Sequence, residues 1–190
     1  MTANRNRVRI IGGKWRSRLL KFPPAAQLRP TPDRVRETLF NWLGQRLDGL
    51  ECLDLFAGSG ALGFEAASRG AARVVMVEND VAVFQSLEKF RDLVGARTVE
   101  LVRGDAFEYL RRSRERFDVV FLDPPFRQNA LPAVFRQLQG ARGTRVYVEA
   151  REPFAPGGPW HELKRSRAGQ VSYQLFEWRG DDQGGLPRDV

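Results

Sequence analysis

The chain has 190 residues, of which 42% are hydrophobic and 28% are charged, values typical of a single globular domain. Its one cysteine, Cys52, excludes a disulfide framework and a cysteine-based metal cluster, and we expect no metal site. The polar, arginine-rich start predicts no signal peptide, and no apolar run is long enough for a membrane span. We therefore expect a cytoplasmic protein without membrane contacts, and a monomer, because no apolar run is left over for association.

The net charge of +8 is concentrated near the start of the chain. Residues 1–36 contain ten Lys or Arg against one acid, Asp33, which leaves the rest of the chain close to neutral. A basic arm on a near-neutral body is typical of a protein that binds a polyanion. We expect RNA contacts from Arg9, Lys14, Arg16, Arg29, Arg34 and Arg36. For Arg34 and Arg36 the alternative is the solvated face of a helix.

The first elements predicted are a hairpin and a helix. Residues 8–22 are expected to form a β-hairpin that turns at Gly12-Gly13. Thr31 is a suitable helix cap, and apolar residues then recur at helical spacing to about residue 47.

From residue 50 onward strand-like and helix-like runs alternate with short links. Strands are predicted at 52–55, 74–77, 99–102, 117–122 and 145–149, and helices at 61–69, 81–94, 106–112 and 131–138. This alternation favours an α/β fold, a parallel sheet covered by helices on both faces, and two last strands at 160–167 and 170–178 would form an antiparallel hairpin. The predicted division is an arm at 1–30, a domain at 31–179 and a disordered tail at 180–190.

An acid, two prolines and an aromatic ring follow the predicted strand at 117–122, in the order Asp123, Pro124, Pro125, Phe126. Two prolines cannot continue a ladder, so the chain turns at the carboxyl end of the strand, where open α/β sheets bind ligands. We expect Asp123 and the Pro124 carbonyl to accept hydrogen bonds from an amino group, and Phe126 to stack on a planar base. The alternative is a tight turn without function.

Gly58, Gly60 and Gly63 spell G-x-G-x-x-G between a predicted strand and a predicted helix. This motif nominally indicates a dinucleotide, but Asp54 just before it would repel a pyrophosphate and attract an amino group. S-adenosylmethionine (SAM) has an amino group and no phosphate.

Further acids end the next two predicted strands. Glu78 suits the ribose hydroxyls of such a ligand, and Asp105 suits the adenine amine. The predicted cofactor contacts are Asp54, Phe56, Gly58, Ser59, Gly60, Glu78, Asn79, Asp105, Ala106 and Asp123.

These motifs, in this order and spacing, resemble the class I SAM-dependent methyltransferases. The segments 7–16, 28–43 and 53–70 resemble the bacterial RsmD family of 16S rRNA guanine-N2 methyltransferases. The resemblance implies a Rossmann-like, seven-stranded, mostly parallel sheet with a reversed C-terminal hairpin and a small N-terminal hairpin extension. It also implies methyl transfer to N2 of a guanine (guanine 966) of 16S rRNA, in the 30S subunit or an assembly intermediate.

Three other functions remain open from the residues. One is an adenine-N6 methyltransferase acting on DNA or RNA, which would share the elbow and the cofactor site. Another is an RNA-binding assembly factor without catalysis. The third is a nicotinamide-dependent oxidoreductase, against which Asp54 and the elbow argue.

Overall fold

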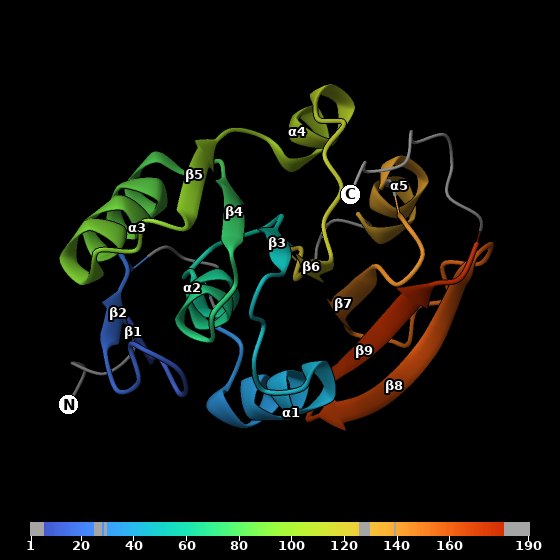
Figure 1. Cartoon of the computed structure of the whole chain (residues 1–190), viewed down its shortest axis with the longest axis horizontal. Coiled ribbons are helices and arrows are strands. Elements are labelled where there is room, and N and C mark those ends of the chain that lie inside the picture. Colours follow the sequence, from blue (N-terminus) through green and yellow to red (C-terminus); the bar gives the residue numbers. More distant parts are fainter. Residues whose placement is uncertain (1–5, 25–27, 29, 126–129, 139, 181–190) are drawn as a thin grey trace.

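The computed structural model of the chain describes residues 6–24, 28, 30–125, 130–138 and 140–180. Its centre is a seven-stranded sheet in the order β5-β4-β3-β6-β7-β9-β8, with helices on both faces (Figure 1). The strands are β3 (Glu51–Asp54), β4 (Arg73–Glu78), β5 (Val99–Arg103), β6 (Val119–Leu122), β7 (Arg145–Ala150), β8 (Trp160–Ala168) and β9 (Val171–Trp178). The first five pair in parallel, and β9 is antiparallel to both β7 and β8. The predicted Rossmann-like sheet with a reversed C-terminal hairpin is thereby confirmed.

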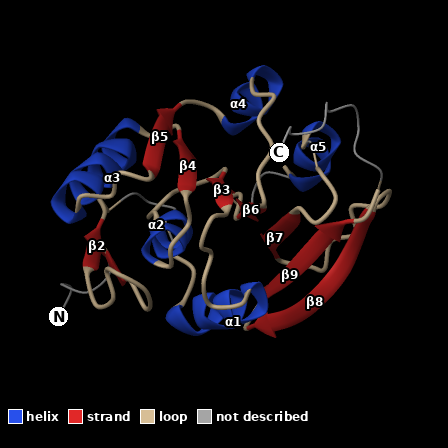
Figure 2. Ribbon diagram, viewed as in Figure 1, coloured by secondary structure: helices blue, strands red, loops and turns tan. Residues whose placement is uncertain are grey.

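The helices divide between the two faces of the sheet (Figure 2). The helices are α1 (Asp33–Leu43), α2 (Ala61–Ser68), α3 (Val81–Val94), α4 (Ala106–Arg112) and α5 (Leu131–Gln137). Side chains of α1, α2 and α3 belong to one buried cluster, and those of α4 and α5 to another. Successive side chains of a strand point to opposite faces of the sheet, so the strands contribute residues to both clusters. Cys52, for example, belongs to the first cluster and Leu53 to the second. No helix in the described part of the chain is long and apolar enough to cross a membrane.

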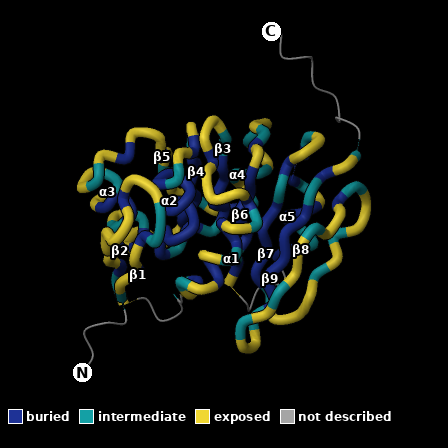
Figure 3. The backbone as a smooth tube through the Cα atoms, turned by 60° about the horizontal axis from the view of Figure 1, so that its bottom comes forward, coloured by how far each residue is buried: buried dark blue, intermediate teal, exposed yellow. Residues whose placement is uncertain are grey.

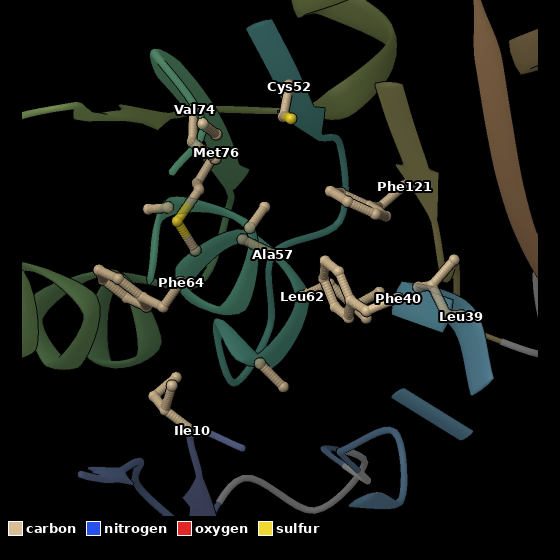
Figure 4. Packing of buried hydrophobic residues seen from close by; sticks show 14 of the residues in the cluster. Ile10, Leu39, Phe40, Cys52, Ala57, Leu62, Phe64, Val74, Met76 and Phe121 are labelled. Atoms are coloured by element: carbon tan, nitrogen blue, oxygen red, sulfur yellow. The ribbon is translucent and has the colours of Figure 1, made fainter. Parts of the chain in front are cut away.

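Helices α1 and α2 both pack closely on one face of the sheet. In Figure 4, Phe40 of α1 lies beside Phe121 of β6, at 6.1 Å between ring centroids. A Cβ on Gly63 would lie 2.7 Å from the sulfur of Met76, so a larger residue would displace the Met76 side chain from its place between α2 and β4. Figure 3 shows the buried segments gathered along the strands, with exposed positions on the outer loops.

The start and end of α1 differ from the prediction. Pro32 occupies the N-cap position and no side chain caps the helix, so the prediction that Thr31 caps it is wrong. The Thr31 hydroxyl points instead to Asp123 Oδ2, 3.4 Å away. The helix ends at Leu43 rather than near residue 47, because Gly44 takes a left-handed conformation (φ 97°).

The amino-terminal hairpin packs as part of the core. β1 (Arg7–Arg9) and β2 (Leu19–Lys21) form a separate antiparallel pair, as predicted, but they are joined by a longer loop than a turn at Gly12-Gly13. This loop docks on the end of α2, where the Ser68 carbonyl accepts from the Lys14 backbone N–H at 2.7 Å. A Cβ on Gly13 would lie 1.9 Å from the same carbonyl oxygen, so the docking requires glycine there.

Arg36 lies beneath this hairpin with no exposed surface. Its guanidinium donates to Glu65 Oε2 (3.3 Å), to Asp33 Oδ1 (2.6 Å), and to the carbonyls of Arg9 (2.8 Å) and Thr31 (3.2 Å). The predicted RNA contact of Arg36 is therefore wrong, and so is the alternative of a solvated position. Its donors are used to join the hairpin, α1 and α2.

Glu65 completes this arrangement from α2. It is equally buried and accepts from the backbone N–H groups of Ile11 and Gly12, at 2.8 Å each, and from Arg69 Nε at 2.7 Å. One ion pair thus satisfies buried polar groups of three separate segments.

Replacing Arg36 with Ala is expected to lower the free energy of unfolding by about 3–5 kcal/mol, because the buried Glu65 would lose one of its two arginine partners and the carbonyls of Arg9 and Thr31 would lose their donor. Arg34→Ala, on the exposed side of the same helix, is the matched control and should change it by less than about 0.5 kcal/mol. Urea unfolding of both variants measures the difference. Equal stability of the two variants would contradict this role of Arg36.

Candidate active site

Five carboxyl groups lie at the carboxyl ends of the five parallel strands. Asp54 ends β3, Glu78 ends β4, Asp105 follows β5, Asp123 follows β6 and Glu149 is the second-last residue of β7. Because these strands are parallel neighbours, the acids share one edge of the sheet. The first four were predicted. Glu149 was missed, although an acid within the apolar run Val146 to Ala150 was a signal for it.

The glycines of the loop between β3 and α2 have different functions. Gly58 and Gly60 both take positive φ angles, 48° and 77°. A Cβ on Gly60 would lie 2.7 Å from Leu87 and 2.8 Å from Phe64, so this glycine permits packing. A Cβ on Gly58 would meet nothing closer than 3.8 Å, the side chain of Leu28. Packing therefore does not require a glycine at position 58, where the positive φ angle and the bare backbone are what glycine provides.

The carboxylate of Glu78 supports this loop from the end of β4. Its Oε2 accepts from the Gly58 N–H and its Oε1 from the Asp80 N–H, both at 2.8 Å. Burial raises the pKa of Glu78, and these hydrogen bonds partly offset the rise. An ionised carboxylate can accept about four hydrogen bonds, so Glu78 retains capacity for ribose hydroxyls. The next residue, Asn79, is exposed.

Asp54 lies under the glycine loop and is only 1% exposed. Its Oδ2 accepts from the Gly63 N–H in the first turn of α2, at 2.9 Å. Burial raises the pKa of Asp54 to about 7, and the nearby Glu78 carboxylate adds to the rise. The Asp54 carboxyl thus anchors the first turn of α2, which follows the glycine loop. Its contact with a ligand remains a prediction. Phe56 is half-buried and Ser59 is buried in this loop.

Asp105 caps α4 at the outer part of the edge. Its Oδ1 accepts from the N–H groups of Phe107 (2.9 Å) and Glu108 (3.0 Å), which is the usual role of an N-cap acid. Its side chain is exposed and the following Ala106 is buried, so a carboxylate oxygen remains available for an adenine amine.

Asp123 and Pro124 form the described part of the predicted elbow. Asp123 is half-buried, Pro124 is buried and Pro125 is exposed. Burial raises the pKa of Asp123 well above its ordinary value, the charges of Glu149 and Asp54 raise it further, and the Thr31 hydroxyl opposes the rise. Phe126 and Arg29 lie outside the described residues.

The chain matches the family described as "Conserved hypothetical protein 95" over residues 8–177. It is 42% identical over 178 residues to "Ribosomal RNA small subunit methyltransferase D" of Escherichia coli (strain K12), covering 90% of this chain and 89% of that protein. The Haemophilus influenzae protein of the same name is 40% identical over 180 residues, covering 90% and 93%. The solved structure titled "Putative methyltransferase yhhF from Escherichia coli" matches with a TM-score of 0.83 at 41% identity, covering 93% and 99%.

The chain belongs to the ribosomal RNA small subunit methyltransferase D family. This confirms the resemblance to the RsmD family, and it identifies the chain as a methyltransferase. The match extends over both the amino-terminal hairpin and the sheet, so the family is defined by the whole arrangement and not by the glycine motif alone.

The other predicted RNA contacts of this family member are exposed, and two of them lie away from the carboxyl edge. Arg9, Lys14, Arg16 and Arg34 are all exposed. Lys14 and Arg16 line a groove of about 780 Å³ between the hairpin loop, the end of α1 and the end of α2. Because α2 begins at the site and ends at this groove, the groove lies toward the opposite end of the strands.

The pH dependence of stability should report the burial of Asp54. A raised pKa means that the folded state keeps a proton that the unfolded state has released. Asp54 therefore lowers the free energy of unfolding as pH rises from about 4 to about 7, by up to about 1.4 kcal/mol per pH unit. Asp54→Asn should flatten this slope in urea unfolding at several pH values.

Asp92→Asn is the matched control, since this acid is exposed on α3. It should leave the wild-type slope. Asp123 and Glu149 act in the same direction and remain in the variant, so part of the slope persists. A slope unchanged by Asp54→Asn would contradict the assignment.

Proposed function

We propose that this protein transfers a methyl group from SAM to the exocyclic N2 of a guanine in 16S rRNA. The observation that carries the proposal is the Asp123-Pro124 elbow beside the glycine loop, in a chain 42% identical to a ribosomal RNA small subunit methyltransferase D. The substrate is guanine 966 of the 30S subunit or of an assembly intermediate, the enzyme acts as a monomer, and its site of action is the cytoplasm.

The residues at the carboxyl edge fit SAM. Gly58 has no side chain to keep a ligand away from the backbone, and the carboxylates of Glu78 and Asp105 can accept from ribose hydroxyls and from an adenine amine. A phosphate-bearing cofactor would meet the acids of this edge instead of the basic groups that phosphate requires. The bound sulfonium supplies an activated methyl group, so the protein has to position the acceptor and receive a proton.

Asp123 has the properties of the group that receives this proton. A guanine amine is a weak nucleophile, and it becomes acidic as its nitrogen forms a fourth bond. The raised pKa makes Asp123 a stronger proton acceptor than an ordinary aspartate, provided that it is ionised when the substrate binds. Such a pKa was not required by the sequence-based mechanism, and it strengthens that mechanism.

The Pro124 carbonyl is proposed to accept the second amino hydrogen, so that the nitrogen lone pair is directed to the methyl group. Orientation of this kind is worth roughly 7–11 kcal/mol of the barrier. The target base has to leave its stack, at a cost of a few kcal/mol. Stacking on Phe126, which would offset about 1–3 kcal/mol of this, remains part of the proposal.

The basic arm is proposed to hold the RNA backbone. The exposed Arg9, Lys14, Arg16 and Arg34 present positive charge along the hairpin and α1, and Arg29 falls between the two in the sequence. Phosphate contacts of this kind position the RNA and do not read its sequence.

Asp123→Ala should lower methyl transfer by about 10²–10⁴-fold while SAM binding changes by only a few-fold, because the proton acceptor is lost and the glycine loop is not. The assay uses tritiated methyl groups and 30S particles that lack the modification, followed by nucleoside analysis. Asp92→Ala on α3 is the control and should retain full turnover. Full turnover by Asp123→Ala would refute the role of Asp123, and labelled N6-methyladenine would favour the adenine enzyme.

Neutralising Lys14 and Arg16 together should weaken RNA binding and reduce its salt dependence. Each lost phosphate contact lowers the slope of log K against log salt by about 0.7–0.9. The control removes the same charge by replacing Arg165 and Arg167, which are exposed on β8 at the far edge of the sheet. If both double variants have the wild-type slope, the arm carries ordinary surface charge.

A further inference from the structure

The Thr31 hydroxyl lies between two carboxyl groups of the candidate active site. Its Oγ1 is 3.4 Å from Asp123 Oδ2, a long hydrogen bond, and it also interacts with the carboxyl of Glu149, whose pKa it lowers. Both residues are buried, since Thr31 and Glu149 are each 4% exposed. Neither residue belongs to the predicted elbow or to the predicted cofactor site.

A hydroxyl group has one hydrogen to donate and lone pairs with which to accept. If both carboxyls were ionised, Thr31 could donate to only one of them and would face the other without a hydrogen. Both contacts are made when one carboxyl carries a proton, donates it to Oγ1, and the hydroxyl donates onward to the other. The geometry thus fits a pair that holds one proton and one negative charge.

The surroundings of the pair decide which partner carries the proton. Asp123 also faces the Asp54 carboxylate from β3, and Tyr147 and Glu149 face it from β7. Tyr147 Oη donates to Glu149 Oε1 at 2.9 Å. The Tyr147 and Thr31 hydroxyls favour the anion of Glu149, whereas Asp123 faces two carboxyl groups and has only the long contact with Thr31 to oppose them, so Asp123 carries the shared proton.

The position of Thr31 is fixed from outside the site. Its carbonyl accepts from Arg36 Nε at 3.2 Å, and Arg36 is held by Glu65 and by the hairpin. Thr31 lies between Pro30 and Pro32, which restrict the backbone on both sides. The segment that enters α1 therefore delivers one hydroxyl to the active site with little freedom.

We infer that Thr31 and Glu149 are positioning residues of this enzyme: Glu149 holds the negative charge that the pair shares, and Thr31 holds the Asp123 carboxyl beside it, so that Asp123, once ionised, is oriented toward the substrate amine and accepts its proton. This inference rests on the proposed function for its catalytic meaning. The arrangement of the pair is testable without substrate.

Substitutions at Glu149 and at Thr31 are expected to shift the titration midpoint of Asp123 in opposite directions. Glu149→Gln removes the neighbouring charge but keeps an N–H that can donate to Thr31, so the Asp123 midpoint should fall by about one pH unit or more. Thr31→Val removes the hydrogen bond that favours the anion, so the midpoint should rise. Thr31→Ser restores the hydroxyl and should restore the wild-type value.

The measurement is a carbon-13 NMR titration of the labelled Asp123 carboxyl in the full chain, assigned by its loss in Asp123→Asn. Glu152→Gln is the matched control, because Glu152 is exposed just beyond β7, and it should leave the midpoint unchanged. The acid limb of single-turnover methylation of 30S particles should move with the NMR midpoint in each variant. Thermal melting of each variant identifies loss of folding, and Thr31→Ser provides a folded comparison for Thr31→Val.

Midpoints that stay at the wild-type value, or that move in the same direction in Glu149→Gln and Thr31→Val, would overturn the inference even if methyl transfer is observed. Opposite shifts in the NMR titration, without methyl transfer by the wild-type protein, would instead refute the proposed function and leave the proton-sharing pair established. A simple structural role would lower the rate without moving either midpoint.

Discussion

The ion pair between Arg36 and Glu65 is the constraint on which the rest of the structure depends. Both side chains have no exposed surface, so each needs every partner that surrounds it. Those partners come from the hairpin, the segment before α1, and α2. A pair of this kind adds little net stability compared with apolar packing, but removing either partner leaves the other buried without its full set of contacts. The position of Thr31 beside Asp123 in the candidate site depends on these contacts of Arg36.

The candidate site concentrates negative charge that the fold has to support. Backbone N–H groups of the glycine loop and of the first turn of α2 point at Asp54 and Glu78, and so replace part of the lost water. Asp123 and Glu149 have fewer such donors, and burial raises the pKa of both. Groups that destabilise the fold in this way are typical of reactive sites, where a carboxyl has to exchange a proton near neutral pH.

The order and type of the helices and strands could be predicted from the sequence, because apolar periodicity and the positions of glycines depend only on neighbouring residues. The same holds for the Gly58–Gly63 loop and for the acids at strand ends. Arg36 could not be placed, since an arginine on a helix looks solvated until the Glu65 partner, far along the chain, is known. Thr31 was assigned to a local cap because its true partner, Asp123, is 92 residues away. Long-range polar contacts leave no periodic signal.

Cys52 lies in β3 with no exposed surface, among the apolar side chains of the first cluster. Burial raises the pKa of its thiol to about 12, so the reactive thiolate is scarce at neutral pH and reagents cannot reach it. The wild-type chain thus resists alkylation and oxidative cross-linking without further engineering. A cysteine introduced on the hairpin would take up a fluorescent dye selectively, and the dye could report how this hairpin contacts RNA.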